Sequence, residues 1–263
     1  MPFSVASCED AGTQRAMISK VAAGPVPVAP RETFCLSCQA RGKGICAALP
    51  AAELSGLAAI SRSRVLASGM PVAREGDHAD AVYTVMSGML KLYKTLPDGR
   101  QQITGFATTG DMVGLAYGET FAYTVETVTA ATVCRFPRNG LNVMMARHPQ
   151  LQARLLTMTS IELTAAQDQI LLLGCKNAAE RIGSFLLTLA RRSPAMDAAD
   201  KGQPVVFLPM QKIDMSAYLG LRPETLSRQF RKLEDAGLIE RVAGDQIRLL
   251  DMDALAEMAG QVG

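Results

Sequence analysis

The sequence predicts an α+β protein in which an antiparallel β-sandwich or barrel precedes a long helix and a small C-terminal domain. Three observations lead to this prediction. Short alternating runs separated by glycines occupy residues 62–138, a stretch without proline follows from 150 to 193, and a second helical pattern ending in a β-hairpin begins near residue 210. The chain has 263 residues, of which 48% are hydrophobic and 20% charged, enough for two folded units with real cores.

Residues 1–30 come before these units and end in the run GPVPVAP, whose prolines favour extended, poorly packed backbone. The sequence therefore predicts a flexible N-terminal tail. This tail lacks the basic region and apolar core of a signal peptide. No apolar run in the chain approaches the roughly 20 residues that a membrane-spanning helix needs. We expect a cytoplasmic protein whose cysteines are kept reduced.

The barrel is predicted from runs such as VYTVM at residues 82–86 and LKLY at residues 90–93, in which apolar and polar residues alternate. Many short strands at this spacing are typical of an antiparallel barrel or jelly roll. The tripeptide at residues 97–99, Pro-Asp-Gly, predicts a hairpin turn, because proline fixes φ and glycine tolerates the positive φ that follows.

A long helix is predicted after Pro149, with a shorter helix behind it. Apolar and small residues recur at alternating spacings of three and four, which is the seam of a two-stranded coiled coil. They are Leu156, Thr159, Leu163, Ala166, Ile170 and Leu173. A second stripe, which would cover the barrel, consists of Leu151, Leu155, Met158, Ala165 and Leu172. Two apolar stripes indicate that the helix packs against a second helix on one side and against the barrel on the other. A helix buried within its own domain would also be apolar on both faces.

The C-terminal region predicts a helix over residues 210–219, a tight turn at 220–222, and a second helix that begins at Pro223, where a missing N–H costs nothing. One face of the second helix carries apolar residues, and the other carries Glu224, Ser227, Arg228 and Arg231. These polar side chains suit base edges and phosphates. A hairpin at residues 237–249 would form a wing beside them. The simpler alternative is a helical hairpin with a solvated charged face.

Three of the six cysteines, Cys35, Cys38 and Cys46, lie within twelve residues. Three thiolates in a glycine-containing loop can hold a [4Fe–4S] cluster, which needs a fourth ligand from elsewhere in the chain. Zinc also accepts four thiolates, and the cysteines could instead be reactive or idle thiols. Cys8 and Cys175 match no ligand position. The residues alone leave these alternatives open.

Other classes of protein gain little support. The formal charge of +2 argues by itself for neither nucleic acid nor membrane, so any basic surface must be local. The chain has no nucleophile elbow, P-loop or Rossmann glycine pattern, and we expect no enzyme activity.

The segment YLGLRPETLSRQFRKLEDAGLI resembles the winged helix-turn-helix of the CRP/FNR superfamily of bacterial transcription regulators. The similarity extends upstream through PDGRQQITGF, GDMVG and QDQILLLGCKNAAERIGSFL to the cysteines, and so covers roughly residues 35–260. Glu224, Ser227 and Arg228 match the FNR-type recognition motif. The chain has Pro223 where CRP-type proteins have an arginine, which also favours the FNR type.

This resemblance implies a domain order and a function. Residues 1–30 would be the tail, 31–148 the cysteine-rich segment and a sensor barrel like that of cyclic-nucleotide-binding proteins, 149–175 the dimerisation helix, and 176–263 the winged helix-turn-helix. Two protomers would pair through Leu156, Leu163, Ala166 and Ile170. They would then read an inverted repeat of TTGAT half-sites through Glu224, Ser227 and Arg228. RNA polymerase is an expected partner, with a contact near residues 97–100 by family analogy.

The resemblance also supplies the expected signal. It places Cys134 where the FNR type draws its fourth cluster ligand, so Cys35, Cys38, Cys46 and Cys134 would hold a [4Fe–4S] cluster that favours the DNA-binding dimer without oxygen and is degraded by oxygen. The spacing C-x2-C-x7-C is longer than the C-x2-C-x5-C of some members, so the resemblance implies no particular oxygen threshold.

The expected effector is not a nucleotide. Cyclic-nucleotide binding would need a cation for the phosphate, and residues 111–134 contain neither arginine nor lysine. The alternatives are the same regulator with a zinc or thiol-redox sensor, and an iron–sulfur protein of electron transfer.

Overall fold

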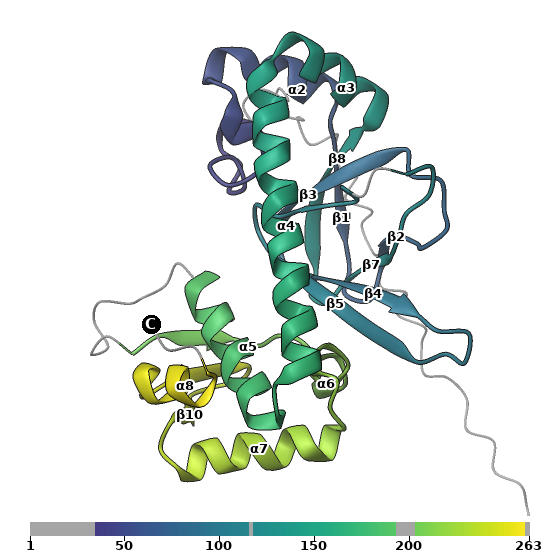
Figure 1. Cartoon of the computed structure of the whole chain (residues 1–263). Helices are drawn as coiled ribbons and strands as arrows, with labels where there is room; N and C mark the ends of the chain where they lie inside the picture. The colour runs from purple at the N-terminus through teal and green to yellow at the C-terminus, as the bar shows by residue number, and fades with distance from the viewer. Residues whose placement is uncertain (1–34, 116–117, 193–202, 261–263) are drawn as a thin grey trace, which may run out of the picture.

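The computed structural model describes residues 35–115, 118–192 and 203–260 (Figure 1). It confirms the predicted fold class: an antiparallel β-domain, a long helix and a C-terminal domain with a helix-turn-helix. The expected tail, residues 1–30, lies outside the described residues, as does Cys8. Among the described helices, none combines the length and apolar character needed to cross a bilayer.

The β-domain consists of two four-stranded antiparallel sheets, with strand orders β1-β8-β3-β6 and β2-β7-β4-β5. The strands are β1 (Arg62–Leu66), β2 (Pro71–Ala73), β3 (Ala81–Ser87), β4 (Leu90–Thr95), β5 (Gln101–Ala107), β6 (Met112–Val113), β7 (Thr124–Thr127) and β8 (Ala131–Pro137). The predicted turn between β4 and β5 is present, and Gly99 has a φ of 85°. This positive φ is why glycine suits the position.

Both faces of strand β3 are buried, although a barrel strand ordinarily has one solvated face. Tyr83 and Val85 point into the barrel and join its inner core. Val82, on the opposite face, packs with a second cluster formed by residues before β1 and by the long helix. The segments that provide this cover are η1 (Ile45–Ala48), η2 (Ala51–Glu53), α2 (Leu54–Ile60), α3 (Arg138–Arg147) and α4 (Pro149–Cys175).

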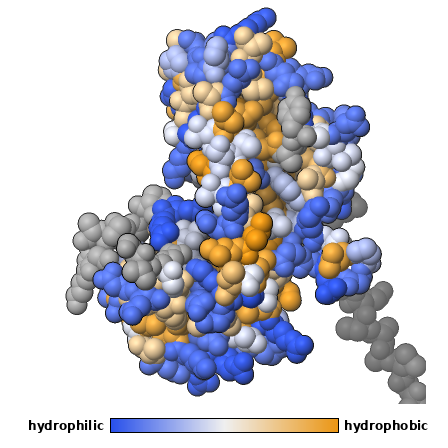
Figure 2. Space-filling model, viewed as in Figure 1, coloured by the Kyte–Doolittle hydropathy of each residue, from blue (hydrophilic) through white to orange (hydrophobic). Residues whose placement is uncertain are grey.

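Helix α4 begins at Pro149 and runs along the barrel to the C-terminal domain (Figure 1). Its second stripe is only partly covered, since Leu151 and Leu172 are buried while Ala165 is exposed. The predicted seam is open: Leu156, Leu163 and Ile170 are 70%, 60% and 72% exposed. Figure 2 shows apolar surface along the course of this helix. Leu173 differs from the rest of the seam because it packs onto the core of the C-terminal domain.

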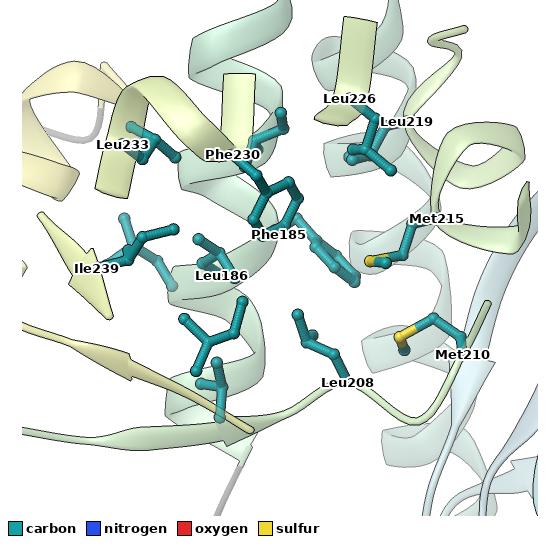
Figure 3. Packing of buried hydrophobic residues seen from close by; sticks show 14 of the residues in the cluster. Phe185, Leu186, Leu208, Met210, Met215, Leu219, Leu226, Phe230, Leu233 and Ile239 are labelled. Atoms are coloured by element: carbon teal, nitrogen blue, oxygen red, sulfur yellow. The ribbon is translucent and has the colours of Figure 1, made fainter. Parts of the chain in front are cut away.

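The C-terminal domain consists of α5 (Ala178–Arg192), β9 (Val205–Phe207), α6 (Lys212–Leu219), α7 (Pro223–Asp235), β10 (Ile239–Arg241), β11 (Gln246–Leu249) and α8 (Met252–Met258). The strands form one sheet in the order β10-β11-β9, which is the predicted wing with one added strand. Phe185 and Leu186 of α5 lie at the centre of the core, against Phe230 of α7 (Figure 3).

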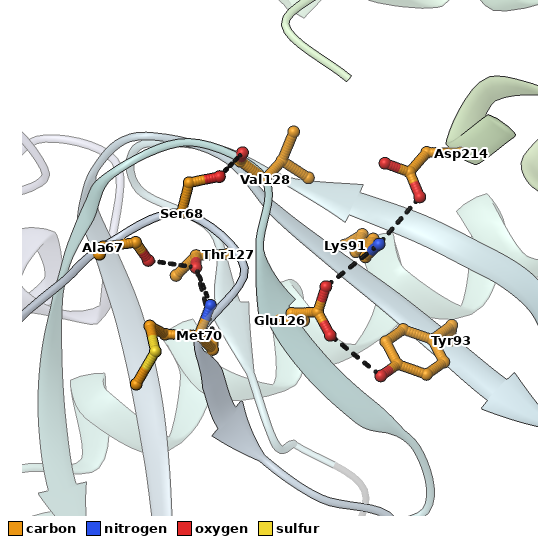
Figure 4. A network of polar contacts seen from close by, with 9 residues as sticks. All are labelled: Ala67, Ser68, Met70, Lys91, Tyr93, Glu126, Thr127, Val128 and Asp214. Carbon is orange, nitrogen blue, oxygen red and sulfur yellow. Dashed lines mark hydrogen bonds and ion pairs between the residues drawn. The ribbon is translucent and has the colours of Figure 1, made fainter. Parts of the chain in front are cut away.

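The barrel and the C-terminal domain are in direct contact. The Lys91 ammonium lies between the Asp214 carboxylate of α6, at 2.8 Å, and the Glu126 carboxylate of β7, at 3.2 Å (Figure 4). Gln102 donates to the carbonyl of Ala217 at 2.6 Å. The apolar core is continuous here, because the ring of Phe106 of β5 packs at a tilt against the ring of Tyr218, with centroids 5.3 Å apart. The β4–β5 hairpin therefore ties the barrel to the first helix of the helix-turn-helix.

Candidate cysteine site and nucleic-acid interface

Four cysteines line a single cavity of about 430 Å³ on the outer face of the barrel. They are Cys35, Cys38, Cys46 and Cys134. The first three come from the segment before the barrel, and the fourth comes from β8. The structure thus brings together the four residues that the resemblance named as ligands. Cys175 is exposed, lies at the end of α4 and does not line this cavity.

The loop between Cys38 and Cys46 is held by its own backbone and by the barrel wall. The amide of Arg41 donates to the carbonyl of Cys38 at 3.0 Å, and the amide of Gly44 donates to that of Ala40 at 2.7 Å. Ile45 is fully buried and anchors the loop in the second apolar cluster, which lies between the barrel and the residues before β1. A Cβ on Gly44 would lie 3.0 Å from the methyl group of Thr84, so any larger residue would have to push the loop or Thr84 aside by a few tenths of an ångström.

Cys134 reaches the cavity because of strand register. In the antiparallel ladders, it lies opposite Ser63 of β1 and Thr84 of β3. Directly opposed residues point to the same side of a sheet. This is the side that α2 and the cysteine loop cover, which places the thiol of Cys134 in the same cavity as the other three.

Burial raises the pKa of cysteine thiols that line the cavity. Burial raises the pKa of Cys46 to about 12, and the proximity of Cys134, Cys35 and Cys38 adds to this rise. Burial also raises the pKa of Cys134 to about 12, although a hydrogen bond from the Ser61 hydroxyl works in the other direction. Thiols that repel one another as anions need a cation between them, and a bound metal would supply the charge that favours deprotonation.

The donor set and the cavity fit an iron–sulfur cluster. Four thiolates are the usual ligands of a [4Fe–4S] group, one for each iron. The cavity is also far larger than the space a single ion occupies. Within the three described ranges, no three Cys, His, Asp or Glu side chains are grouped so that they could hold one metal ion. One buried hydroxyl in the cavity wall, Thr84 Oγ1, has no hydrogen-bond partner within the described ranges of the chain.

Arg154 connects the cysteine loop to α4, and sequence reasoning missed it. Its guanidinium donates to the carbonyl oxygens of Lys43 and Gly44, the latter at 3.4 Å. A charged donor on a helix that faces two loop carbonyls carries no recognisable sequence pattern. The contact means that the loop holding three of the cysteines is attached directly to the helix that carries the exposed seam.

The proposed DNA-reading residues form an exposed row on α7. Arg222 is the N-cap and Pro223 the first helical residue, as predicted. Leu226, Phe230 and Leu233 are buried, whereas Glu224, Arg228 and Arg231 are exposed and Ser227 is half-buried. In the described part of the chain, no hydrogen bond or ion pair engages the side chains of Glu224, Arg228 or Arg231. Their donor and acceptor groups are therefore available to a partner.

The wing lies next to this helix and is fastened to it. Arg241 of β10 pairs with Glu234 at the end of α7. Arg248 of β11 pairs with Glu240 at 2.8 Å, across the hairpin. The Gly220 turn that sets α6 against α7 has a φ of 62°, and a side chain there would meet Leu173 and Arg181. Together these contacts fix the angle at which the row on α7 is presented.

Two family models match the chain. Residues 63–148 match the cyclic nucleotide-binding domain, and residues 180–258 match the Crp-like helix-turn-helix domain. The first match covers the barrel with α3, and the second covers nearly the whole C-terminal domain.

Several curated proteins are similar over most of the chain. The nitrogen fixation regulation protein FixK of Bradyrhizobium diazoefficiens is 38% identical over 234 residues, 88% of this chain and 97% of FixK. The transcriptional activator protein FnrL of Cereibacter sphaeroides is 37% identical, with 86% and 92% of the two chains covered. The fumarate and nitrate reduction regulatory protein of Escherichia coli is 35% identical, with 76% and 80% covered.

The structure of FixK2 from Bradyrhizobium japonicum superposes with a TM-score of 0.70 and 32% identity, over 76% of this chain and 97% of FixK2. A CooA mutant from Carboxydothermus hydrogenoformans, 17% identical, shares the fold with a TM-score of 0.68, over 79% of this chain and 91% of CooA.

Proposed function

The chain belongs to the CRP/FNR family of transcription regulators, and from this premise we propose that it is a homodimeric, sequence-specific regulator that senses oxygen through a [4Fe–4S] cluster. The observation that carries the proposal is the cavity in which four cysteines from distant parts of the chain meet. The ligands would be Cys35, Cys38, Cys46 and Cys134. When bound, the cluster supplies a group that oxygen can attack.

The residues of this chain supply the remaining parts. Four thiolates hold the cluster, and Arg154 ties the ligand loop to α4. The exposed apolar residues Leu156, Leu163 and Ile170, with Ala166 between them, form the surface that a second protomer covers. A change in the loop therefore reaches the dimer interface through a single helix. This is a physical path by which the state of the cluster can alter dimerisation.

DNA reading is assigned to the exposed row on α7. Arg228 can bind guanine O6 and N7 bidentately, Glu224 can accept from cytosine N4, and Ser227 suits either base edge. Arg231 lies one turn further along, where phosphate is the natural partner. Two such helices in a dimer would read an inverted repeat of TTGAT half-sites, the site type of FNR-like members. The exposed turn at residues 97–100 is our candidate contact for RNA polymerase, on family analogy.

A cyclic nucleotide is not the proposed signal, although the barrel matches the cyclic nucleotide-binding domain. The inner face of the barrel is a packed cluster of apolar side chains that includes Tyr83 and Phe121. The phosphate of a nucleotide would also require a cation. The segment from 111 to 134, where relatives that bind cyclic AMP carry theirs, contains no arginine or lysine.

The deciding experiment is to measure iron and acid-labile sulfide on protein purified without oxygen, and then to follow the visible spectrum as air is admitted. We expect about four irons and four sulfides per chain, with absorbance that air bleaches. The same samples should bind a TTGAT inverted repeat tightly before exposure to air and weakly after it. If the protein contains zinc and no sulfide, the regulator would respond to zinc or to thiol oxidation instead of to oxygen through a cluster. If it contains the cluster but binds no DNA, an electron-transfer protein would be favoured.

A further inference from the structure

Thr84, in the middle of β3, is an exception among the buried threonines of the barrel. Only 3% of the residue is exposed, and its Oγ1 has no hydrogen-bond partner among the residues that the structure describes. Thr127, which is 1% exposed, shows the usual arrangement: its hydroxyl donates to the carbonyl of Ala67 at 2.6 Å and accepts from the amide of Met70 at 2.8 Å (Figure 4). A buried hydroxyl without a partner loses its bonds to water and gains nothing in return.

Packing alone does not explain a hydroxyl at this position. A valine has nearly the same shape, favours strands equally and would avoid the cost of burying a polar atom. The methyl group of Thr84 already serves the packing role, since it is the atom against which Gly44 of the cysteine loop lies. The hydroxyl branches from the same carbon and belongs to a residue of the cavity wall. Its partner is therefore to be sought in the cavity.

The position of Thr84 points to sulfur as that partner. Thr84 lies directly opposite Cys134 in the ladder between β3 and β8, and both residues line the cavity. Side chains directly opposed on one face of a sheet have Cβ atoms about 5 Å apart, which is within reach of a hydrogen bond to a group held on the neighbouring thiolate. The thiolates and sulfides of a cluster can accept hydrogen bonds but cannot donate them.

We propose that the Thr84 hydroxyl donates a hydrogen bond to a sulfur of the bound cluster, either Cys134 Sγ or the sulfide next to it, and so acts as a positioning residue for the fourth ligand. The proposal rests on the cluster of the preceding section and adds a residue outside the cysteine set. Hydrogen bonds to cluster sulfurs help to set the electronic properties of the cluster. The hydroxyl would be satisfied in the loaded protein and unsatisfied in the cluster-free one.

The test compares the full chain with its Thr84→Val, Thr84→Ser and Thr132→Val variants. Thr132 lies on β8 two residues before Cys134, outside the cavity wall, and its substitution makes the same chemical change without touching the proposed bond. Each protein is prepared anaerobically with its cluster, and again after the iron has been removed with a chelator. Thermal midpoints are measured in both states, and the iron–sulfur stretching bands of the loaded state are recorded by resonance Raman spectroscopy.

For Thr84→Val we expect a higher thermal midpoint than the parent in the cluster-free state and a lower one in the loaded state. The iron–sulfur bands should shift, because a hydrogen bond to sulfur is lost. Thr84→Ser should keep the parent's bands, and Thr132→Val should change the two midpoints equally. If Thr84→Val does not accumulate, Thr84→Ala permits the same comparison between loaded and cluster-free protein.

An equal change of midpoint in both states, with unshifted bands, would overturn the role of Thr84 while leaving the cluster in place. Absence of iron and sulfide from the parent protein would instead overturn the proposed function and this inference together. The two failures are therefore distinguishable by the analysis of the parent alone.

Discussion

The recognition helix and the cysteine site differ in how they are built. The polar row on α7 comes from eight consecutive residues, Glu224 to Arg231, and needs only that this segment be helical with its apolar face buried. The cysteine site joins a loop before the barrel to Cys134 in its last strand, so it exists only when the whole sheet has its correct register. The row on α7 is exposed to solvent, whereas the cysteine site lies in a cavity on the outer face of the barrel.

This difference predicts different responses to mutation. A residue of the exposed row can be removed at little cost to folding, because it contacts the rest of the chain only through its helix. A residue of the enclosed site shares its surroundings with three other thiols, and its loss leaves an incomplete ligand set. The contacts of Arg154, between the cysteine loop and α4, and of Lys91, between the barrel and α6, should give effects of intermediate size.

The largest expected effect comes from Cys134→Ala. Because the other three thiols cannot supply the fourth ligand, anaerobically purified protein should lose the cluster absorbance together with its sulfide. Cys175→Ala is the matched control, since that cysteine is exposed and outside the cavity, and it should keep both. Full retention of iron and sulfide in Cys134→Ala would rule out the ligand assignment.

Arg228→Ala should weaken binding to the specific inverted repeat by about 1–3 kcal/mol and relax discrimination at one base pair, as expected for the loss of a bidentate base contact. Fluorescence anisotropy with specific and scrambled duplexes measures both quantities. Arg231→Ala, on the same helix, removes the proposed phosphate contact and should weaken binding to all sequences alike. If Arg228→Ala behaves as we expect of Arg231→Ala, Arg228 is a phosphate contact.

The ion pair between barrel and C-terminal domain should contribute about 1 kcal/mol to stability, measured as the coupling between Lys91→Met and Asp214→Asn in urea unfolding. The pair is largely enclosed, with side chains 14% and 15% exposed. Burial alone would lower the pKa of Lys91, but the carboxylates of Asp214 and Glu126 outweigh this effect, so the pKa is raised. Lys94 and Glu75 form an exposed control pair, 56% and 36% exposed, with a coupling expected near zero. Equal couplings would show that enclosure adds nothing.

Arg154→Ala should leave the cluster in place but reduce the advantage that the cluster gives to dimerisation by about fivefold, which corresponds to the net contribution of one ordinary hydrogen bond, about 1 kcal/mol. Analytical ultracentrifugation gives the dimer dissociation constant of the protein with and without the cluster, and the ratio of the two constants measures how much the cluster strengthens the dimer. Gln152→Ala, an exposed change on the same helix, should leave the ratio unaltered. An unchanged ratio in Arg154→Ala would remove this side chain from the path between loop and interface.

The smallest effect concerns Glu162 of α4. Burial raises its pKa, the hydrogen bond from Tyr123 at 3.3 Å opposes the rise, and Asp111 adds to it. A carboxyl whose pKa is raised by folding destabilises the protein increasingly as pH climbs from the ordinary value of Glu through the raised one. Glu162→Gln should therefore raise the thermal midpoint at pH 7.5 and have no effect near pH 4. A gain of equal size at both pH values would mean that charge is not its cause.

The local features of this protein could be predicted from its amino-acid sequence alone. Proline at position 223, the buried trio Leu226, Phe230 and Leu233, and the glycine turns at 99 and 220 each depend on near neighbours, so backbone preference and periodicity were enough to place them. The C-x2-C-x7-C spacing indicated a site of some kind, and Cys134 was added only through family resemblance.

Tertiary structure decided what lies around those features. Thr84, Ser61 and Arg154 reach the cysteine cavity or its loop from three separate elements, and no spacing in the sequence records that they meet. The same holds for Lys91 and Asp214, and for Ala165, which the periodicity placed on the covered stripe of α4 and the structure leaves exposed. A one-dimensional pattern reports which face of an element is apolar. Only the packing of sheets and helices determines what that face meets, because those contacts join residues far apart in the chain.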